Sequence, residues 1–294
     1  MDFRPAPSTI VKTYPPRGPM QQYRFAESTA FDCFRCGQAK KSKLITVYCQ
    51  DWSRRLCNGC YGRLLSIYEI KGGTAPDDER ADALAAALAG MAAGDDVRQA
   101  EKLFRASEER AARLSSEALR FISTAEYVAG TLEADPQLEW SPAVIGLCKA
   151  VETELIARII NPLAFLISRE DLSADRQDKD MGRVAAFCAD PSRKPPEVGV
   201  FAHFLQTVSH SKHRRESSVL ARAFLKLLAS WPGSQWLLQP DGLHAALSLL
   251  TTNFRNPAAH TDELSQHDYS ACREHVIGTE GTLWKLLVAT EPHR

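Results

Sequence analysis

Apolar residues recur every three or four positions along most of the chain that follows residue 80. The clearest stripe consists of Val144, Leu147, Val151, Leu155 and Ile159. This spacing places the side chains on one face of an α-helix. Further helices are predicted within 80–134 and at about 217–230, 241–253 and 265–290. No alternating strand pattern is evident after residue 70, so the fold class is predicted to be mainly α.

Turn-forming residues and prolines divide the chain into four segments. Residues 1–30 contain several prolines and are expected to form an extended N-terminal arm. Residues 31–71 hold a cysteine cluster, while 72–136 open with GGTAPDDE and are expected to form a linker and a helical segment. Residues 137–294 are expected to form one helical domain, in which Asn161–Pro162 should kink or end a helix.

The composition is that of an ordinary soluble protein, with 44% hydrophobic residues, 24% charged residues and a formal net charge of zero. The longest apolar runs fall well short of the roughly 20 residues that a membrane-spanning helix needs. The N-terminus also lacks the basic-then-apolar layout of a secretory signal. We therefore expect a cytoplasmic protein with no membrane partner.

Five of the eight cysteines lie between residues 33 and 60. In a chain without an export signal, such a cluster indicates metal ligands before disulfides. The two CxxC pairs are Cys33 with Cys36 and Cys57 with Cys60, and each pair can supply half of a tetrahedral zinc site. We predict one structural zinc ion per chain, which would stabilise a segment too small to fold on its own core. The alternative is a set of buried free thiols, and Cys49 is left outside the predicted ligand set.

The second CxxC pair runs directly into a helical pattern, and this arrangement resembles the treble-clef zinc finger of the GATA type. The matching residues are Cys57, Asn58 and Cys60, with Cys33 and Cys36 as the first pair. The resemblance covers about 30 residues. This chain departs from that family in a longer segment between the pairs and in the residues after Cys60. Reading of a DNA sequence is therefore not carried over.

The cysteine segment is locally basic although the whole chain is neutral. Residues 31–71 contain eight basic and three acidic side chains. Cations in this pattern favour contact with phosphates, largely without sequence reading. The residues predicted to contact nucleic acid are Lys40, Lys41, Lys43, Arg54, Arg55 and Arg63. The alternative interpretation is a solvated charged face, since charge runs alone are weak evidence.

The stretch TNFRNPAAHTDE, residues 252–263, places Arg255, Asn256, Pro257 and His260 within six positions. Asparagine followed by proline is typical of a helix start, so Asn256 is predicted to be an N-cap. A helix N-terminus carries partial positive charge, which would favour a neutral imidazole at His260. With the Arg255 guanidinium beside it, such a site could bind a phosphate and transfer a proton. The alternative is a capped helix with no chemistry.

In its helical setting, the RNPAAH stretch resembles the Arg-x4–6-His motif of HEPN domains. The upstream segment SPAVIGLCKAVETEL is also similar to an early HEPN helix. The resemblance covers about residues 137–290. It implies a C-terminal HEPN-like helical bundle, a homodimer and a metal-independent endoribonuclease of toxin–antitoxin or phage-defence systems. The catalytic residues would be Arg255, Asn256 and His260, with Glu152 or Glu154 supporting them from the neighbouring helix.

Two hypotheses follow for the whole chain. The first is an endoribonuclease that leaves 2′,3′-cyclic phosphate ends on its RNA substrate, with a zinc finger that contacts nucleic acid and a possible antitoxin or defence-system partner. The second is a non-catalytic nucleic-acid- or protein-binding module with a zinc finger and a dimerising helical domain. The position of His260 discriminates between them, because a base needs an accessible ring nitrogen.

Overall fold

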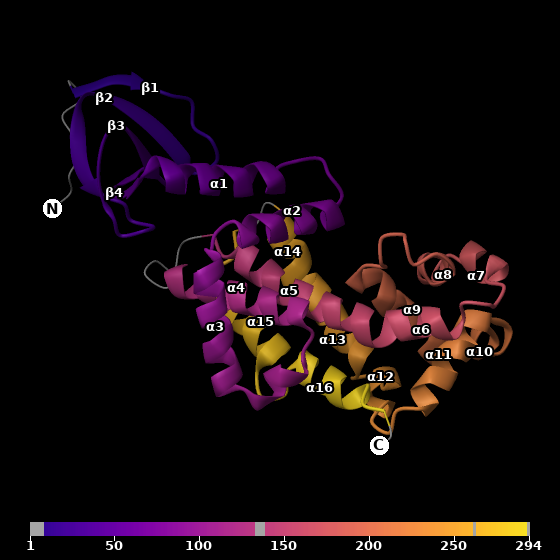
Figure 1. Cartoon of the computed structure of the whole chain (residues 1–294). Coiled ribbons are helices and arrows are strands. Elements are labelled where there is room, and N and C mark those ends of the chain that lie inside the picture. The colour runs from indigo at the N-terminus through magenta and orange to yellow at the C-terminus, as the bar shows by residue number, and fades with distance from the viewer. Residues whose placement is uncertain (1–8, 133–138, 261–262, 293–294) are drawn as a thin grey trace.

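The structure of the protein is a computed structural model, which describes residues 9–132, 139–260 and 263–292. A small sheet stands at one end of the molecule, and helices form the rest of the described chain (Figure 1). The predicted helical C-terminal region is confirmed, and every strand in the described residues ends before residue 57. No helix in these ranges is long and apolar enough to cross a bilayer.

The sheet has four antiparallel strands in the order β1-β2-β3-β4. The strands are β1 (Ile10–Thr13), β2 (Met20–Asp32), β3 (Ala39–Tyr48) and β4 (Asp51–Leu56). The segment predicted to be an extended arm therefore supplies β1 and most of β2. Met20, which pairs with Tyr48 of β3, and Phe25, which pairs with Ile10 of β1, are both buried. The prolines of this segment favoured the prediction of an extended arm. Three of them lie in the connection between β1 and β2.

Helix α1 (Asn58–Lys71) follows the sheet directly, and α2 (Asp77–Ala89), α3 (Gly94–Ser107) and α4 (Ser116–Leu132) come next. These three helices occupy most of the segment predicted to be a linker and helical segment. They belong to the helical body, because α2 and α4 both pack against α5 (Ser141–Leu155). Gly146 of α5 permits this close approach, since a Cβ there would lie 2.5 Å from the Leu88 side chain and 3.1 Å from that of Ala125.

The remaining helices complete the body around α5 (Figure 1). They are α6 (Asn161–Leu166), α7 (Ser173–Gln177), α8 (Gly182–Ala189), α9 (Val198–His210), α10 (Lys212–Ser217), α11 (Val219–Ala229), α12 (Gln235–Leu238), α13 (Leu243–Leu249), α14 (Asn256–Ala259), α15 (Gln266–Ile277) and α16 (Thr282–Ala289). A short 3₁₀ helix, η2 (Glu109–Arg113), precedes α4. The apolar stripe predicted for residues 144–159 is buried throughout, so it forms the centre of the core.

Two segments of π-helix each precede an Asn-Pro pair. The first, η3 (Ile156–Ile160), joins α5 to α6, and the second, η4 (Leu250–Arg255), joins α13 to α14. Proline cannot donate a backbone hydrogen bond and crowds the preceding turn, so a locally wider turn is one way to keep the helix continuous. The predicted N-cap at Asn256 is therefore wrong, because its φ of −67° and ψ of −48° are helical and the helix begins earlier.

A buried ion pair joins the end of α1 to the start of α5. The Lys71 Nζ atom lies 2.8 Å from a carboxylate oxygen of Glu139 and donates to the Ser141 hydroxyl at 3.0 Å. Both charged side chains are at most 1% exposed. Glu139 also accepts hydrogen bonds from the backbone N–H groups of Ser141 and Leu264. This network fixes the sheet and α1, which together form the cysteine-containing segment, against the helical body.

We predict that Lys71→Met lowers the free energy of unfolding by about 3–5 kcal/mol, because it leaves the Glu139 carboxylate buried without its cation. Chemical denaturation followed by circular dichroism measures the loss. Adding Glu139→Gln should recover part of it by removing the uncompensated charge. Lys102→Met, at an exposed position of α3, is the matched control. Equal losses in Lys71→Met and Lys102→Met would contradict the assigned role of the pair.

Candidate zinc and phosphate sites

The four cysteines of the two CxxC pairs converge at one point of the cysteine-containing segment. Cys33 and Cys36 lie in the turn between β2 and β3, while Cys57 and Cys60 lie at the start of α1. Their four sulfur atoms lie within 4.8 Å of one another. A tetrahedral zinc ion with bonds of about 2.3 Å needs sulfur atoms about 3.8 Å apart, so the group fits this metal after small adjustments. Cys49 is not part of the group.

Hydrogen bonds around Cys33 favour its thiolate. The Cys60 thiol lowers the pKa of Cys33 to about 4, and the backbone N–H groups of Cys57 and Cys36 act in the same direction. Thiolates are the form that binds metal. The Arg35 guanidinium lies beside the Cys60 sulfur. It is placed to offset part of the negative charge that four thiolates bring to a zinc ion.

A hollow of about 470 Å³ lies against three of these cysteines, Cys36, Cys57 and Cys60. The predicted residues Lys40, Lys41 and Arg63 line it, together with Ser42 and Asn58. The other three predicted residues, Lys43, Arg54 and Arg55, are not among its lining residues. Arg54 instead pairs with Asp51 at 3.3 Å, and Arg55 lies over the Phe31 ring. The structure therefore brings together half of the predicted nucleic-acid-binding set.

Arg255 and His260 lie at the last two elements of one continuous helix. Arg255 ends η4 and is only 4% exposed, whereas the His260 side chain follows α14 and is 46% exposed. The backbone N–H group of His260 donates to the Asn256 carbonyl at 3.0 Å, so His260 lies at the end of a helix and not at its start. The predicted effect of a positive helix end on His260 therefore does not apply. Asn256 lies between them as an interior helix residue.

The first turn of α2 covers both side chains. The Arg255 guanidinium donates to the Asp78 carboxylate, and the His260 Nε2 atom lies 3.2 Å from an oxygen of Asp77. The Arg80 Nη1 atom lies 3.5 Å from His260 Nδ1 and donates to the Ala259 carbonyl at 3.2 Å. An arginine can only donate, so Nδ1 accepts and Nε2 carries the proton toward Asp77 in the neutral ring. Both ring nitrogens are thus engaged by α2.

The environment of Arg255 confirms that its cation is strongly held. Burial alone lowers the pKa of Arg255, but the Asp78 carboxylate more than offsets this effect, and Glu152 contributes in the same direction, so the pKa is raised. Glu152 of α5, one of the two acids expected near this site, is therefore close enough to act on Arg255. Glu154 points elsewhere: it pairs with Arg158 and accepts from the Ser115 backbone.

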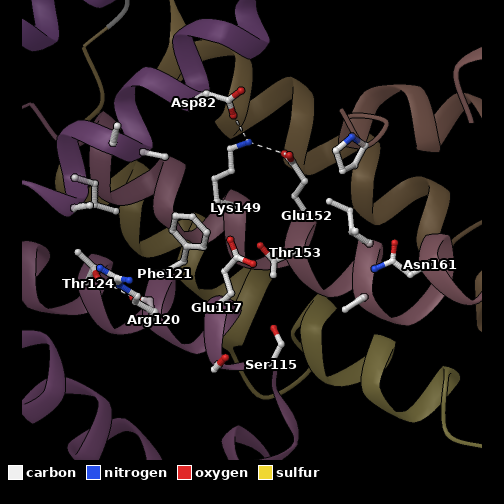
Figure 2. A pocket seen from close by; sticks show the side chains of 18 residues that line it. Asp82, Ser115, Glu117, Arg120, Phe121, Thr124, Lys149, Glu152, Thr153 and Asn161 are labelled. Carbon is white, nitrogen blue, oxygen red and sulfur yellow. Dashed lines mark hydrogen bonds and ion pairs between the residues drawn. The ribbon is translucent and has the colours of Figure 1, made fainter. Parts of the chain in front are cut away.

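A cavity of about 760 Å³ opens beside this contact, between α2, α4 and α5 (Figure 2). Lys149 of α5 forms part of its wall, where it bridges Asp82 at 2.5 Å and Glu152 at 2.9 Å. Asp82 lies one helical turn after Asp78 on α2. The bridge therefore holds α2 against α5 at a second point, just beyond the Arg255 contact.

The residues that sequence reasoning missed are those that α2 contributes, namely Asp77, Asp78, Arg80 and Asp82. Acidic residues in a first turn are common simply because they complement the helix dipole. This local explanation also fits Asp77 and Asp78. Their partners, His260 and Arg255, lie 177 or more positions later in the chain. No spacing rule connects residues so far apart.

No family model, curated protein or solved structure matches this chain.

We predict that the purified protein carries about one zinc ion per chain, since four thiolates complete the coordination. Cys57→Ser should lose the metal and the order of the sheet, and it should keep most of its helical circular dichroism because α4 and α5 pack directly on each other. Metal analysis by mass spectrometry measures the ion. Cys49→Ser is the matched control, because Cys49 is exposed and outside the group. A zinc content that falls equally in both variants would contradict the assignment.

Proposed function

We propose that the chain is a metal-independent endoribonuclease of the HEPN type, in which Arg255 and His260 act on RNA and the zinc finger contacts nucleic acid. The observation that carries the proposal is the pairing of both side chains with consecutive carboxylates. Arg255 meets Asp78 and His260 meets Asp77. A cation and an imidazole that together hold two neighbouring anions form a site with the electrostatic character that a phosphodiester requires.

The chemistry follows from the properties of these side chains once the carboxylates have moved away. An imidazole takes the proton from the 2′-hydroxyl, and the freed oxygen attacks the adjacent phosphorus. The bond from phosphorus to the 5′-oxygen then breaks, and that oxygen receives a proton from an acid. Arg255 offers a planar pair of donors to the phosphoryl oxygens, on which negative charge grows in the transition state. The products end in a 2′,3′-cyclic phosphate and a 5′-hydroxyl.

The base and the acid lie on opposite sides of the phosphorus in such a reaction, whereas one chain supplies a single Arg255–His260 pair. Two-fold association doubles the set without any new residue. A homodimer through the helical body therefore belongs to the proposal. The zinc ion takes no part in the chemistry, because four cysteines leave no open coordination position.

We predict that the protein cleaves RNA in the presence of EDTA and leaves DNA of the same sequence intact, because the nucleophile is a 2′-hydroxyl. His260→Ala removes the group that transfers the proton and should slow cleavage by about 10²–10⁴-fold. His260 is exposed, so this change should leave the melting temperature and the zinc content unaltered. His213→Ala, an exposed histidine on α10, is the matched control and should cleave like the wild type. Gel analysis with mass spectrometry of the RNA ends gives rate and product.

Arg255→Lys separates charge from geometry at the same site. Lysine preserves the positive charge opposite Asp78, but an ammonium cannot make the planar two-point contact with a phosphate. The rate should therefore fall by roughly 10²–10³-fold while the fold persists. Cleavage that is unchanged in His260→Ala, or that depends on added magnesium, would assign the activity to other residues.

A second candidate function is binding of nucleic acid without cleavage. One observation favours it: Arg255 is 4% exposed and its guanidinium is already paired, as in a purely structural ion pair. The binding surface would then be the hollow beside the cysteines, where Lys40, Lys41 and Arg63 surround a space large enough for a phosphate group. Contacts of this kind depend on salt rather than on sequence.

For this surface we predict that Lys40→Glu combined with Lys41→Glu weakens binding of single-stranded RNA by at least about tenfold, because repulsion replaces two phosphate contacts. Fluorescence anisotropy at two salt concentrations measures the effect. The double change Lys212→Glu and Lys226→Glu places the same charges on α10 and α11, and it should have a smaller effect. Equal weakening by the two double variants would show that only net charge matters.

A further inference from the structure

We propose that the first turn of α2 is a built-in competitor of the RNA phosphate, which closes the Arg255–His260 site until substrate displaces it. The inference rests on the ribonuclease function proposed above and adds its regulation. It concerns three residues of one turn, Asp77, Asp78 and Arg80. Each of them contacts a group that catalysis would have to use.

The contacts occupy the polar groups of both side chains, while the His260 side chain is 46% exposed. Asp78 takes the Arg255 guanidinium, which would otherwise bind phosphoryl oxygens. Asp77 lies 3.2 Å from Nε2 of His260, and Arg80 lies 3.5 Å from Nδ1 of the same ring. A base needs one ring nitrogen with an available lone pair. In this arrangement one nitrogen faces a carboxylate and the other faces a guanidinium, so neither can reach a 2′-hydroxyl.

Two consecutive carboxylates resemble a phosphodiester in the properties that matter to Arg255 and His260. They offer several anionic oxygens at hydrogen-bonding distance from the same donors. An RNA phosphate and the Asp77–Asp78 pair therefore compete for one set of partners. Only molecules in which the first turn of α2 is displaced can bind RNA. The apparent affinity for substrate is therefore the intrinsic affinity multiplied by the fraction of such open molecules.

Displacement of α2 would also move Arg80. In the closed site this side chain is 15% exposed, pairs with Asp77 at 3.5 Å and holds the Ala259 carbonyl. Because Arg80 lies in the same turn as Asp77 and Asp78, it moves away from His260 together with them. Arg80 is therefore assigned as a residue that holds the closed state.

The covering turn is held at both ends by contacts that can break independently of the core. On one side the Gly72–Pro76 connection links it to α1. On the other side Asp82 is bound to Lys149 and to Lys194, at 2.5 and 2.8 Å. The Asp82–Lys194 pair is exposed on both sides, and such ion pairs are weak, whereas Lys149 is 12% exposed. Opening of the first turn requires the loss of the hydrogen bond from Arg80 to the Ala259 carbonyl and of the buried pair between Asp78 and Arg255.

The test compares RNA cleavage by the full-length wild type and by the variant Asp77→Asn with Asp78→Asn. Asparagine preserves size and hydrogen bonding, and it removes the charges that compete with phosphate. The variant should cleave at least about fivefold faster, the lower end of the usual range for coupled equilibria. The matched control is Asp95→Asn with Asp96→Asn, another acidic pair in the first turn of a helix, which should cleave like the wild type. Adding His260→Ala to the activated variant should abolish the gain.

Should the double variant fail to fold, Asp77→Asn alone decides the matter, because Asp77 and His260 are both partly exposed. Cleavage by the wild type together with an equal or lower rate in a folded Asp77→Asn variant overturns the competitor and leaves the ribonuclease standing. Absence of cleavage in the wild type and in every variant overturns the ribonuclease, and the competitor falls with it. Cleavage that appears only after the charges are removed supports both.

Discussion

The position of α2 depends on Arg80 and on the buried pair next to it. The Arg80 side chain donates to the carbonyl of Ala75 at 2.7 Å and to those of Lys71 and Ala259 at 3.2 Å. It therefore ties together the end of α1, the connection to α2 and the end of α14. The side chain of Lys71 is meanwhile fixed to Glu139 at 2.8 Å. Charge-assisted hydrogen bonds of this kind are stronger than neutral ones, so they hold the first turn of α2 against α14 in the closed site.

This constraint gives the two candidate sites their different characters. The cysteine group is compatible with one metal ion, and the hollow beside it is lined by the side chains of Lys40 and Lys41, which form no ion pair with any described residue. The Arg255–His260 pair lies under α2, and its charge is already balanced by the chain itself. Figure 1 shows α2 between α1 and the helical body, above α14.

The sequence was informative wherever a local rule applied. Short CxxC spacings predict convergent sulfur atoms, and the four cysteines do converge. Helical periodicity predicted the buried stripe of α5. The same kind of reasoning was wrong at Asn256, because an Asn-Pro pair usually starts a helix, and here a π segment carries the helix through the proline. It also overlooked β1 and β2, because the pairing of β2 with β3 has no signal in residues 1–30 alone. Contacts between Asp78 and Arg255 span most of the chain, so no pattern of spacing could have found them.

Chemical function was predictable only as far as the residue types allow. Arg255 and His260 are the right groups for phosphodiester cleavage, and the structure brings them to one place. The sequence could not show that Arg255 and His260 are already paired with carboxylates, because those carboxylates lie on a helix more than 170 positions away. The position of His260 therefore does not decide between a ribonuclease and a non-catalytic module. Its ring is about half exposed, yet both ring nitrogens have partners.

Hydrogen–deuterium exchange with and without RNA tests whether α2 covers a phosphate-binding site. A single-stranded oligonucleotide with 2′-O-methyl groups would bind without being cleaved. If α2 is the cover, residues 77–82 exchange faster when this oligonucleotide is bound, while exchange in the buried α5 is unchanged. If residues 77–82 exchange at the same rate or more slowly with the oligonucleotide bound, α2 is not a cover that RNA displaces.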